Sequence, residues 1–570
     1  MMQLSRRQFL KVSAGTVAVA AIADKTLALT ALQPVVEVDN PLGEYPDRSW
    51  ERVYHDQYRY DSSFTWCCSP NDTHACRIRA FVRNGVVMRV EQNYDHQTYE
   101  DLYGNRGTFA HNPRMCLKGF TFHRRVYGPY RLKGPLMRKG WKQWMDDGSP
   151  ELTSDAKRKY KFDSRFLDDM VRVSWDTAFT YVAKGLIVIG TRYSGEAGAR
   201  RLREQGYAPE MIEMMKGAGV RTFKHRAGMP ILGMMGKHAN TRFNNCVLPL
   251  LDSWIRKVNP DQAQGGRYWN NYTWHGDQDP SQPWWNGTQN CDVDLSDMRF
   301  TKLNTSWGKN FVENKMPEAH WKLESMERGA RLVVITPEYN PTASRADYWI
   351  PVRPETDGAL FLGASKIILD ENYQDIEFIK GFTDMPLLVR TDTLQYLDPH
   401  EVLRDCRVPD FTKSYSGRVQ GLTQDQVQRL GGMMVWDLAK GKAVPLHREQ
   451  VGLHLAQSGI DPALTGTYRI KLLNGREVDV MPIYQLYTIH LQDYDLDTVH
   501  QVNRSPKDLI VRWARDCGTV KPAAIHNGEG VCHYFHMTSM GRAAALVMML
   551  TGNIGKFGTG CHTWSGNYKV

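Results

Sequence analysis

The first clear pattern of apolar positions in the chain is a pair of short strand-like runs. Residues 78–82 and 86–90 are rich in β-branched and aromatic side chains, and Asn84-Gly85 lies between them. Asn-Gly is the dipeptide most typical of a two-residue hairpin turn, because both residues accept a left-handed backbone. The sequence therefore predicts a β-hairpin directly after Cys76.

From residue 173 onward, helical and strand-like patterns alternate. Ser174 precedes apolar residues at helical spacing, which predicts a helix capped by its hydroxyl. The apolar run Leu332–Ile335 follows a helix-like stretch from Pro317 to Arg328, as expected for a buried parallel strand with a crossover helix. Ala523–Ile525, a Gly-rich turn and a helix through Leu550 form a second such unit. The pattern predicts an α/β fold with a doubly wound parallel sheet.

Composition narrows the class of protein. The chain has 570 residues, of which 42% are hydrophobic and 24% are charged, values typical of a globular protein with several domains. The net charge of +10 includes no run of five basic residues, so nucleic-acid binding gains no support. Residues 29–60 are expected to form an extended arm, and the charged, turn-rich residues 134–170 a domain boundary.

The N-terminal residues have the pattern of an export signal. Arg6-Arg7 is followed by the apolar run Val12–Ala23 and by small residues near Ala28, the pattern of a twin-arginine signal peptide over residues 1–28. The apolar run is too short to span a bilayer, and no later segment approaches 18 uninterrupted apolar residues. We expect a soluble, periplasmic or otherwise extracytoplasmic protein, exported in its folded state with its cofactors in place.

Cysteine spacing points to a metal centre near the hairpin. Of ten cysteines, six are scattered singly, whereas Cys68, Cys76 and Cys116, with Asp72, give four anionic ligand candidates separated by three, three and 39 residues. An iron–sulfur cluster needs one ligand per iron, and the hairpin supplies the path that returns Cys116 to the others. Two alternatives remain open at this point: structural zinc, or a disulfide joining Cys68 to Cys76 or Cys67 to Cys116.

Several segments, in this order, resemble one enzyme family. They resemble the catalytic (alpha) subunit of molybdopterin oxidoreductases of the dimethyl sulfoxide reductase superfamily, most of all nitrite oxidoreductases and respiratory nitrate reductases. The segments are residues 71–85, 112–119, 130–139, 173–176, 307–310, 333–337, 353–357 and 550–560. The resemblance implies a [4Fe–4S] N-terminal hairpin domain followed by doubly wound parallel-sheet domains.

For the iron–sulfur cluster, the resemblance implies the ligands Cys68, Asp72, Cys76 and Cys116. Relatives usually have Cys where this chain has Asp72, and often His in place of Cys68. A carboxylate is harder than a thiolate but is anionic and binds iron. An Asp at this place is expected in nitrite oxidoreductases, which favours that substrate. Lys118 is expected to lie between the cluster and the pterin.

For molybdenum, the resemblance implies a carboxylate ligand. The spacing to Pro280 and Pro283 selects Asp277 over Asp279, although His275 stands where relatives tend to have Tyr. Without the resemblance, this segment would be interpreted as a solvated acidic turn. Asn71 and His533, by the same resemblance, line the oxyanion pocket and complete the catalytic set with Asp277.

The resemblance also implies molybdenum bis(molybdopterin guanine dinucleotide). Its phosphates and guanine bind at the carboxyl ends of parallel strands, where glycine permits close approach and helix N-termini attract anions. Asp357 is expected to accept from the guanine N–H edge. The full set of expected cofactor contacts is Lys118, Asn304, Trp307, Gly308, Asn310, Thr336, Pro337, Thr356, Asp357, Gly528 and Gly530.

These expectations define a domain plan and a reaction. After the signal, residues 29–172 form the [4Fe–4S] domain with its lead-in, and residues 173–560 form the dinucleotide-binding α/β region. The family's chains run longer, so the C-terminal domains are expected to be absent and this chain to be a fragment. The reaction is oxygen-atom transfer between nitrite and nitrate.

The expected oxygen-atom transfer implies electron-transfer partner subunits and a substrate. Electrons leave through the cluster to an Fe–S (beta) subunit, with a haem gamma subunit as a further candidate, and membrane association occurs through partners only. The substrate is a small oxyanion. Alternative substrates are chlorate, selenate, dimethyl sulfide or a hydrocarbon. The rival class is an exported module stapled by disulfides and lacking molybdenum.

Overall fold

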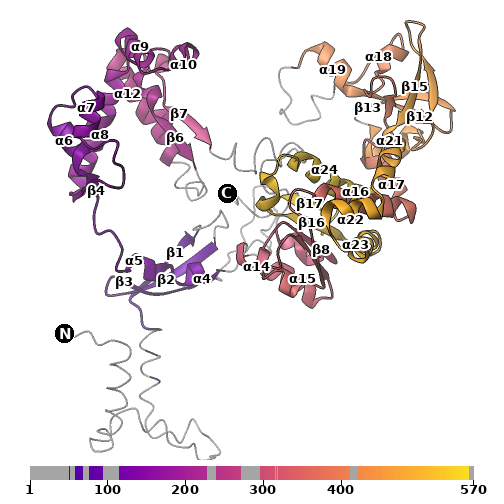
Figure 1. Ribbon diagram of the computed structural model, residues 1–570, viewed down its shortest axis with the longest axis horizontal. Coiled ribbons are helices and arrows are strands. Elements are labelled where there is room, and N and C mark those ends of the chain that lie inside the picture. Colours follow the sequence, from indigo (N-terminus) through magenta and orange to yellow (C-terminus); the bar gives the residue numbers. More distant parts are fainter. Residues whose placement is uncertain are drawn as a thin grey trace, which may run out of the picture. The chain divides into compact units, whose positions relative to one another are not determined.

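A computed structural model gives the fold of most of the chain (Figure 1). It describes residues 51, 55, 58–68, 76–93, 115–227, 239–270, 295–314, 316–317, 319–410, 422–447 and 450–563. The chain forms two compact units, residues 1–62 with 82–88, and residues 63–81 with 89–570. The expected signal peptide and the predicted site residues Asn71, Asp72 and Asp277 lie outside the described residues.

The predicted hairpin is confirmed. It belongs to a three-stranded sheet in the order β1-β2-β3, formed by Ser62–Cys68, Cys76–Arg83 and Val86–Gln92. Asn84 and Gly85 have φ values of 50° and 75°, the left-handed conformations that a tight hairpin turn requires. Two short helices follow, α4 (Leu117–Phe120) and α5 (Phe122–Val126).

Residues 136–270 are largely helical. Strands β4 (Leu136–Arg138) and β5 (Met170–Arg172) pair antiparallel, and β6 (Lys224–Ala227) and β7 (Arg267–Asn270) pair parallel. The α-helices are α6 (Lys139–Asp146), α7 (Ser154–Lys159), α8 (Trp175–Arg192), α9 (Gly195–Glu204), α10 (Pro209–Met214) and α12 (Leu248–Arg256). Shorter turns are η3 (Gly219–Thr222), η5 (Phe243–Val247) and η6 (Pro260–Gln262).

One local prediction here is confirmed, and the stretch predicted to be turn-rich contains helices. The Ser174 hydroxyl accepts the Thr177 N–H at 3.1 Å and caps α8, as the sequence indicated. Residues 134–170, expected to be a turn-rich boundary, instead contain α6 and α7. The rings of Trp141 and Tyr181 lie 6.1 Å apart, so contacts cross the boundary expected at residue 172.

The second unit contains a five-stranded sheet whose pairings are all parallel. The strand order is β10-β9-β8-β16-β17. The strands are β8 (Leu303–Trp307), β9 (Arg331–Thr336), β10 (Tyr348–Pro351), β16 (Ala523–Asn527) and β17 (Gly560–Thr563). The predicted doubly wound α/β fold is therefore confirmed, and both buried strands predicted from the sequence belong to this sheet.

Helices cover this sheet and complete its core (Figure 1). They are α14 (Phe311–Asn314), α15 (Ala319–Glu327), α16 (Asp357–Asp370), α17 (Ile376–Phe382), α22 (Leu496–Asn503), α23 (Lys507–Thr519) and α24 (Met537–Leu550). Turns η8 (Leu295–Phe300), η9 (Ala343–Arg345) and η14 (Glu529–His533) join them. The largest apolar cluster packs one sheet face against side chains of α16, α23 and α24.

Residues 388–491 hold a small β-rich insertion that the sequence analysis did not anticipate. Its sheet has the order β11-β15-β14, and β12 pairs with β13 as an antiparallel ribbon. The strands are Leu388–Arg390, Gly432–Asp437, Lys442–His447, Tyr468–Lys471 and Glu477–Pro482, from β11 to β15. Its helices are α18 (Pro399–Val402), α19 (Gln424–Gly431), α20 (Leu455–Ser458) and α21 (Ile483–His490), with turns η12 (Gly452–His454) and η13 (Leu491–Asp493).

Within the described part of the chain, no helix is both long and apolar enough to cross a bilayer.

Candidate cofactor edge and cysteine cluster

The sheet changes winding direction between β8 and β16. From β8 the chain proceeds outward through β9 to β10, whereas β16 leads outward on the other side to β17. In such sheets, ligands bind beyond the carboxyl ends of the strands at this switch point. The predicted residue Trp307 ends β8 and Gly308 follows it, and Gly528 follows β16, so the structure brings both predicted turns to one edge.

Two glycines make the contact between these turns possible. Gly308 has φ +57°, and a Cβ there would lie 2.3 Å from Val531 Cγ1. A Cβ on Gly528 would lie 2.1 Å from the Gly308 carbonyl oxygen. The Gly528 N–H donates to the Trp307 carbonyl at 2.8 Å. Any side chain at either position would separate the turns, so glycine is required for the shape of this edge.

Trp307 and Asp357, both predicted cofactor contacts, bind each other. The indole N–H of Trp307 donates to Asp357 Oδ1 at 2.7 Å, and both side chains are buried. Burial raises the pKa of Asp357, and the Trp307 hydrogen bond opposes that shift. The Trp307 ring packs on Phe361 with centroids 4.8 Å apart. Trp307 therefore supports the edge from within the core, and Asp357 has one carboxylate oxygen engaged.

Other predicted side chains also bind the protein itself. Thr336 donates to the Glu338 carbonyl, and Thr356 donates to the Arg353 carbonyl. Asn310 accepts from the Thr342 hydroxyl at 3.0 Å and donates to Glu313. Asn304 is buried in β8 and donates to Ser325 at 2.9 Å. These side chains shape the loops, so a ligand at this edge would meet mainly backbone.

Helix N-termini at the same edge offer backbone donors. Helix α16 begins right after Thr356, and α24 after His536, and neither N-cap residue makes a side-chain cap. Uncapped N–H groups attract phosphate and other anions. Asn527 Oδ1, at the end of β16, is buried and has no hydrogen-bond partner among the described residues. The edge therefore offers donors to a phosphate and an acceptor to an N–H group, which fits a dinucleotide.

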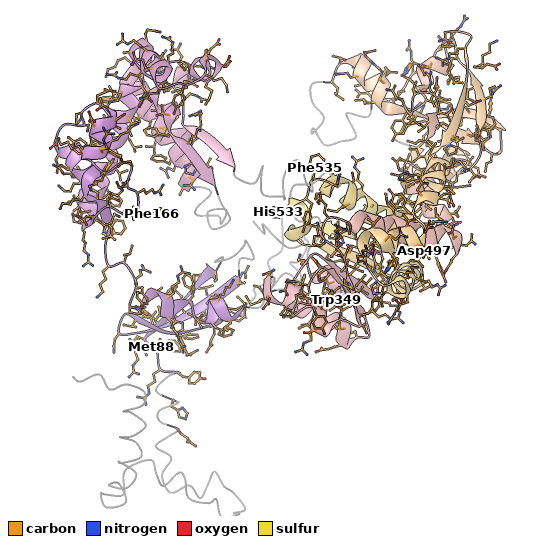
Figure 2. The ribbon with its side chains drawn as sticks, in the orientation of Figure 1. Met88, Phe166, Trp349, Asp497, His533 and Phe535 are labelled. Carbon is orange, nitrogen blue, oxygen red and sulfur yellow. The ribbon has the colours of Figure 1, made fainter. Side chains whose placement is uncertain are left out.

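Four predicted residues are solvent-exposed. His533 ends η14, and Figure 2 shows it with the neighbouring Phe535, which is 93% exposed, ahead of α24. Gly530 lies in the same turn, and Pro337 follows β9. Lys118, in α4, is also exposed and belongs to the cysteine cluster described next. The cofactor role of each remains a prediction.

The three described cysteines of the predicted cluster lie in one small region. Cys68 ends β1, Cys76 begins the adjacent β2, and both are buried. Cys116 is partly buried and precedes α4. Gln92 connects the segments that carry Cys116 and Cys76. Its Oε1 accepts the Met115 N–H at 2.6 Å, and its Nε2 donates to the Arg77 carbonyl at 3.1 Å.

Gln92 is the residue here that the sequence analysis missed. Its two hydrogen bonds tie the neighbour of Cys116 to the neighbour of Cys76, and it is only 8% exposed. The position of Gln92 at the end of a predicted strand was visible in the sequence, but its partners were not. Close packing of Gly119 on Ile78 supports the same contact, since a Cβ at Gly119 would lie 3.1 Å from Ile78 Cδ1.

The arrangement of Cys68, Cys76 and Cys116 bears on whether these residues form a disulfide or bind a metal group. In the described part of the chain, no disulfide joins Cys68, Cys76 or Cys116 to one another. Among the described residues, which do not include Asp72, no three His, Cys, Asp or Glu side chains form a group that could hold a single metal ion. A four-iron cluster binds one ligand per iron, so its ligands are spread more widely. Cys68 and Cys76 belong to neighbouring strands and Cys116 precedes α4, and their role as cluster ligands remains a prediction.

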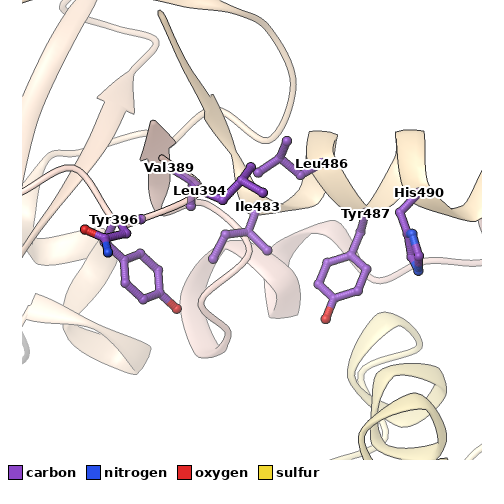
Figure 3. A pocket seen from close by; sticks show the side chains of 8 residues that line it. Val389, Leu394, Tyr396, Ile483, Leu486, Tyr487 and His490 are labelled. Atoms are coloured by element: carbon purple, nitrogen blue, oxygen red, sulfur yellow. The ribbon is translucent and has the colours of Figure 1, made fainter. Parts of the chain in front are cut away.

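A separate apolar pocket lies in the β-rich insertion (Figure 3). Its volume is about 680 Å³, and it is lined by Val389, Leu394, Gln395, Tyr396, Ile483, Leu486, Tyr487 and His490. Burial raises the pKa of Tyr487, with Asp384 adding to the effect. None of the predicted site residues lines this pocket.

The parallel sheet and its switch-point edge have the arrangement of an α/β ligand-binding fold. The family model described as Molybdopterin oxidoreductase matches residues 131–566, well over half of the chain. The chain therefore belongs to the molybdopterin oxidoreductase family. A model of the twin-arginine translocation signal matches residues 3–23, which supports export by that route.

Relatives with known names agree with this family. The perchlorate reductase alpha subunit of Dechloromonas aromatica is 27% identical over all of this chain and 53% of its own length. The respiratory nitrate reductase alpha subunit of Haloferax mediterranei is 27% identical over 97% of this chain and 47% of its own. The chlorate reductase alpha subunit of Ideonella dechloratans is 26% identical over 98% and 50%. This chain spans about half the length of these relatives.

The chain is also similar to a solved structure. The acetylene hydratase of Pelobacter acetylenicus superposes with a TM-score of 0.42 and 15% identity, covering 86% of this chain and 43% of its own.

Proposed function

We propose that this chain carries the molybdenum- and iron–sulfur-binding part of the catalytic subunit of an exported oxyanion oxidoreductase, with nitrite and nitrate as the first substrate pair. The observation that carries the proposal is the switch-point edge between β8 and β16, which lies within the family match over residues 131–566. When bound, the molybdenum cofactor supplies a two-electron centre that exchanges an oxygen atom with the substrate.

The chain's own residues have distinct roles in this proposal. The glycine turns at Gly308 and Gly528 let the phosphates of the guanine dinucleotide approach backbone N–H groups. Asp357 offers its remaining carboxylate oxygen to the guanine N–H edge. Asp277 is the carboxylate ligand of the metal, and Asn71 with His533 binds the oxyanion. Of these, Asp277 and Asn71 rest on the sequence alone.

The substrate class draws support from the relatives, whose names include perchlorate, nitrate and chlorate reductases. Within this class, Asp72 favours nitrite, because an Asp at that place is expected in nitrite oxidoreductases. Chlorate and perchlorate are the second candidates, since two of the relatives are named for them. An Fe–S beta subunit is the proposed electron acceptor, since the relatives are named as alpha subunits.

Metal analysis of the protein from its native cell tests the class. The expected result is molybdenum together with four irons per chain. Steady-state rates with nitrite and an artificial acceptor, and with nitrate, chlorate and perchlorate and an artificial donor, then rank the substrates. A protein with neither metal would belong to the rival class of exported modules.

Two aspartates test the molybdenum ligand. In the complete enzyme, Asp277→Ala should abolish oxygen-atom transfer while the iron–sulfur signal persists, because it removes a charged ligand. The matched control is Asp279→Ala, two residues farther along, which should stay active. An inactive Asp279 variant beside an active Asp277 variant would move the ligand to Asp279.

The cluster has its own test. Asp72→Cys should retain four irons and shift the reduction potential, because a thiolate replaces a harder carboxylate. Gln92→Ala should lower iron content, because it removes both hydrogen bonds that tie the Cys116 and Cys76 segments together. An unchanged potential in the Asp72 variant would exclude that residue as a ligand.

A further inference from the structure

The loop between α7 and β5 presents two adjacent apolar side chains to solvent. Phe166 and Leu167 are 89% and 90% exposed, and Figure 2 labels Phe166 in the helical region. Single exposed apolar side chains are common in proteins, but two neighbours that touch so little of the protein are not. We call these two residues the apolar tip.

The loop that carries the apolar tip is held firmly at both ends. Arg138 Nε donates to Asp168 Oδ2 at 2.6 Å, and the Asp168 side chain is only 3% exposed. Arg138 also donates to the Lys161 carbonyl, at the start of the loop. The Lys139 N–H donates to the Asp169 carbonyl at 2.9 Å. The loop is therefore fastened to β4 and α6, and the tip projects from a fixed base.

The backbone of the apolar tip is unfavourable for the residue it holds. Phe166 has φ +72°, in the left-handed region that residues with bulky side chains rarely adopt. Such conformations persist where the surrounding structure imposes them, and they are frequent at functional sites. Exposing a phenyl ring adds nothing to the stability of the fold. The conformation of Phe166 thus points to a role outside the protein's own core.

The surroundings of the apolar tip are cationic. Three exposed basic residues near it in the chain form no ion pair among the described residues: Lys157, Lys161 and Arg165. The Arg165 guanidinium lies 5.0 Å from the centroid of the Phe166 ring. The exposed acids of the loop are Asp163 and Asp169. Residues 130–172 together hold eleven Lys and Arg against seven Asp and Glu.

An apolar tip within a cationic surround matches the surface of an anionic membrane. In such contacts the apolar side chains enter the boundary between headgroups and acyl chains, and Lys and Arg meet the lipid phosphates. Arg165 can keep its guanidinium among the headgroups while its stem follows the Phe166 ring. A chain with a twin-arginine signal reaches the outer face of a membrane after export.

A protein partner fits the apolar tip less well. A specific protein interface buries roughly 800 Å² on each side, whereas one aromatic side chain supplies about 150 to 250 Å². Two projecting side chains on a narrow loop therefore offer too little surface for such an interface by themselves. Insertion into a lipid surface has no such requirement.

We propose that the loop at residues 160–169 binds directly to a lipid bilayer with anionic headgroups, and that Phe166 and Leu167 enter its interface. The inference goes beyond the proposed function, because it involves neither molybdenum nor an oxyanion. It also adds a direct contact to the expectation that the membrane is reached through partners only.

The test measures sedimentation of the full chain, purified after export, with two kinds of vesicle. One kind is pure phosphatidylcholine, and the other contains phosphatidylglycerol as well. The chain should bind the phosphatidylglycerol vesicles more tightly, and added salt should weaken that binding because it screens the lysines and arginines.

Substitutions in the loop separate the apolar and the cationic contributions. Phe166→Asn suits the left-handed backbone, and it and Leu167→Ser should each weaken vesicle binding roughly tenfold by removing one apolar side chain. Arg165→Gln should weaken binding to phosphatidylglycerol vesicles about fivefold and leave phosphatidylcholine binding unchanged. Phe166→Trp should retain binding, because Trp favours the membrane interface.

The control is an aromatic side chain of matching exposure in another part of the chain. Phe535 is 93% exposed, and Phe535→Asn should bind vesicles like the unaltered chain. The variants replace exposed side chains, so their melting temperatures should stay within those of the unaltered chain.

Three results would overturn the inference. The first is no binding to phosphatidylglycerol vesicles, and the second is undiminished binding by the double variant Phe166→Asn/Leu167→Ser. The third is self-association of the unaltered chain without lipid that the double variant loses, which would assign the tip to a protein interface. None of these measurements depends on molybdenum, so the inference and the proposed function can fail separately.

Discussion

The two faces of the five-stranded sheet are built on different principles. One face is apolar and packs on α16, α23 and α24, with Trp307, Phe361 and Trp513 at its centre. The opposite face, under β8 and β16, carries Asn304, Ser306 and His526 beneath α15. The apolar face accounts for stability through burial of surface. The polar face gains less from burial of apolar surface, and Asn304 and Ser306 are held there by hydrogen bonds to Ser325 and Lys322 of α15.

The largest expected effect is on the apolar face. Trp513 is fully buried, and its indole N–H donates to Thr305 Oγ1 at 3.0 Å. Trp513→Ala should lower the free energy of unfolding by about 3 to 5 kcal/mol, because it removes the ring and leaves a cavity. Urea denaturation followed by circular dichroism measures the loss. The control is Phe535→Ala, an exposed aromatic, for which the midpoint should not move.

A smaller effect is expected on the polar face. Ser325 Oγ accepts from Asn304 Nδ2 at 2.9 Å and donates to the Lys322 carbonyl. Because Asn304 Oδ1 has no partner among the described residues, Ser325→Ala would leave the whole buried amide unpaired. We expect a loss of about 1 to 3 kcal/mol in the same urea assay. The exposed Ser344→Ala serves as control. A loss larger than that of Trp513→Ala would reverse the comparison between the faces.

The edge where the faces meet should show a pH effect. Burial raises the pKa of Asp357 in the folded chain above its ordinary value of 3.8. The folded state thus binds this proton more tightly than the unfolded state, and that stabilisation is lost as pH rises through the folded pKa. Asp357→Asn keeps an acceptor for Trp307 and cannot ionise.

The Asp357→Asn variant should therefore be more stable than the unaltered chain at neutral pH, with the gain vanishing below about pH 4. Melting temperatures measured from pH 3 to pH 8 would show this. A variant that is less stable at neutral pH would mean that the ionised carboxylate has a stabilising partner.

The smallest effect is expected outside both faces. Asp425 and Arg429 form an i,i+4 ion pair on α19, and their side chains are 70% and 66% exposed. Arg429→Ala should change the free energy of unfolding by less than about 0.5 kcal/mol, because such helix-surface pairs are solvated. A larger change in the urea midpoint would show that charges outside the sheet also contribute.

Local signals in the sequence predicted much of this fold. The Asn84-Gly85 turn, the Ser174 cap and the apolar run at Leu332–Ile335 each depend on neighbouring residues, and all three are confirmed. Helices α6 and α7 were missed because their residues are charged and lie among turn-forming residues. The insertion at residues 388–491 was missed because its strands are short and its pairings are long-range.

The candidate site was only partly visible in the sequence. Glycine motifs led correctly to the switch-point edge, because they follow buried strands. The polar face was not visible, since Lys322 looks like an ordinary surface lysine of a helix until α15 is docked on β8. Likewise, the role of Gln92 depends on partners 15 and 23 residues away in sequence. Such contacts follow from tertiary structure and leave no local pattern.

The adjacency of β8 and β16 has a consequence for biosynthesis. Thr305 of β8 and its partner Trp513 are 208 residues apart. At a synthesis rate of about 5 to 20 residues per second, a ribosome needs roughly 10 to 40 s to cover that distance. Throughout this interval β8 has an unpaired edge, which is open to pairing with other nascent chains. The turns at Gly308 and Gly528 meet only afterwards, so the switch-point edge is among the last features of this unit to form during translation.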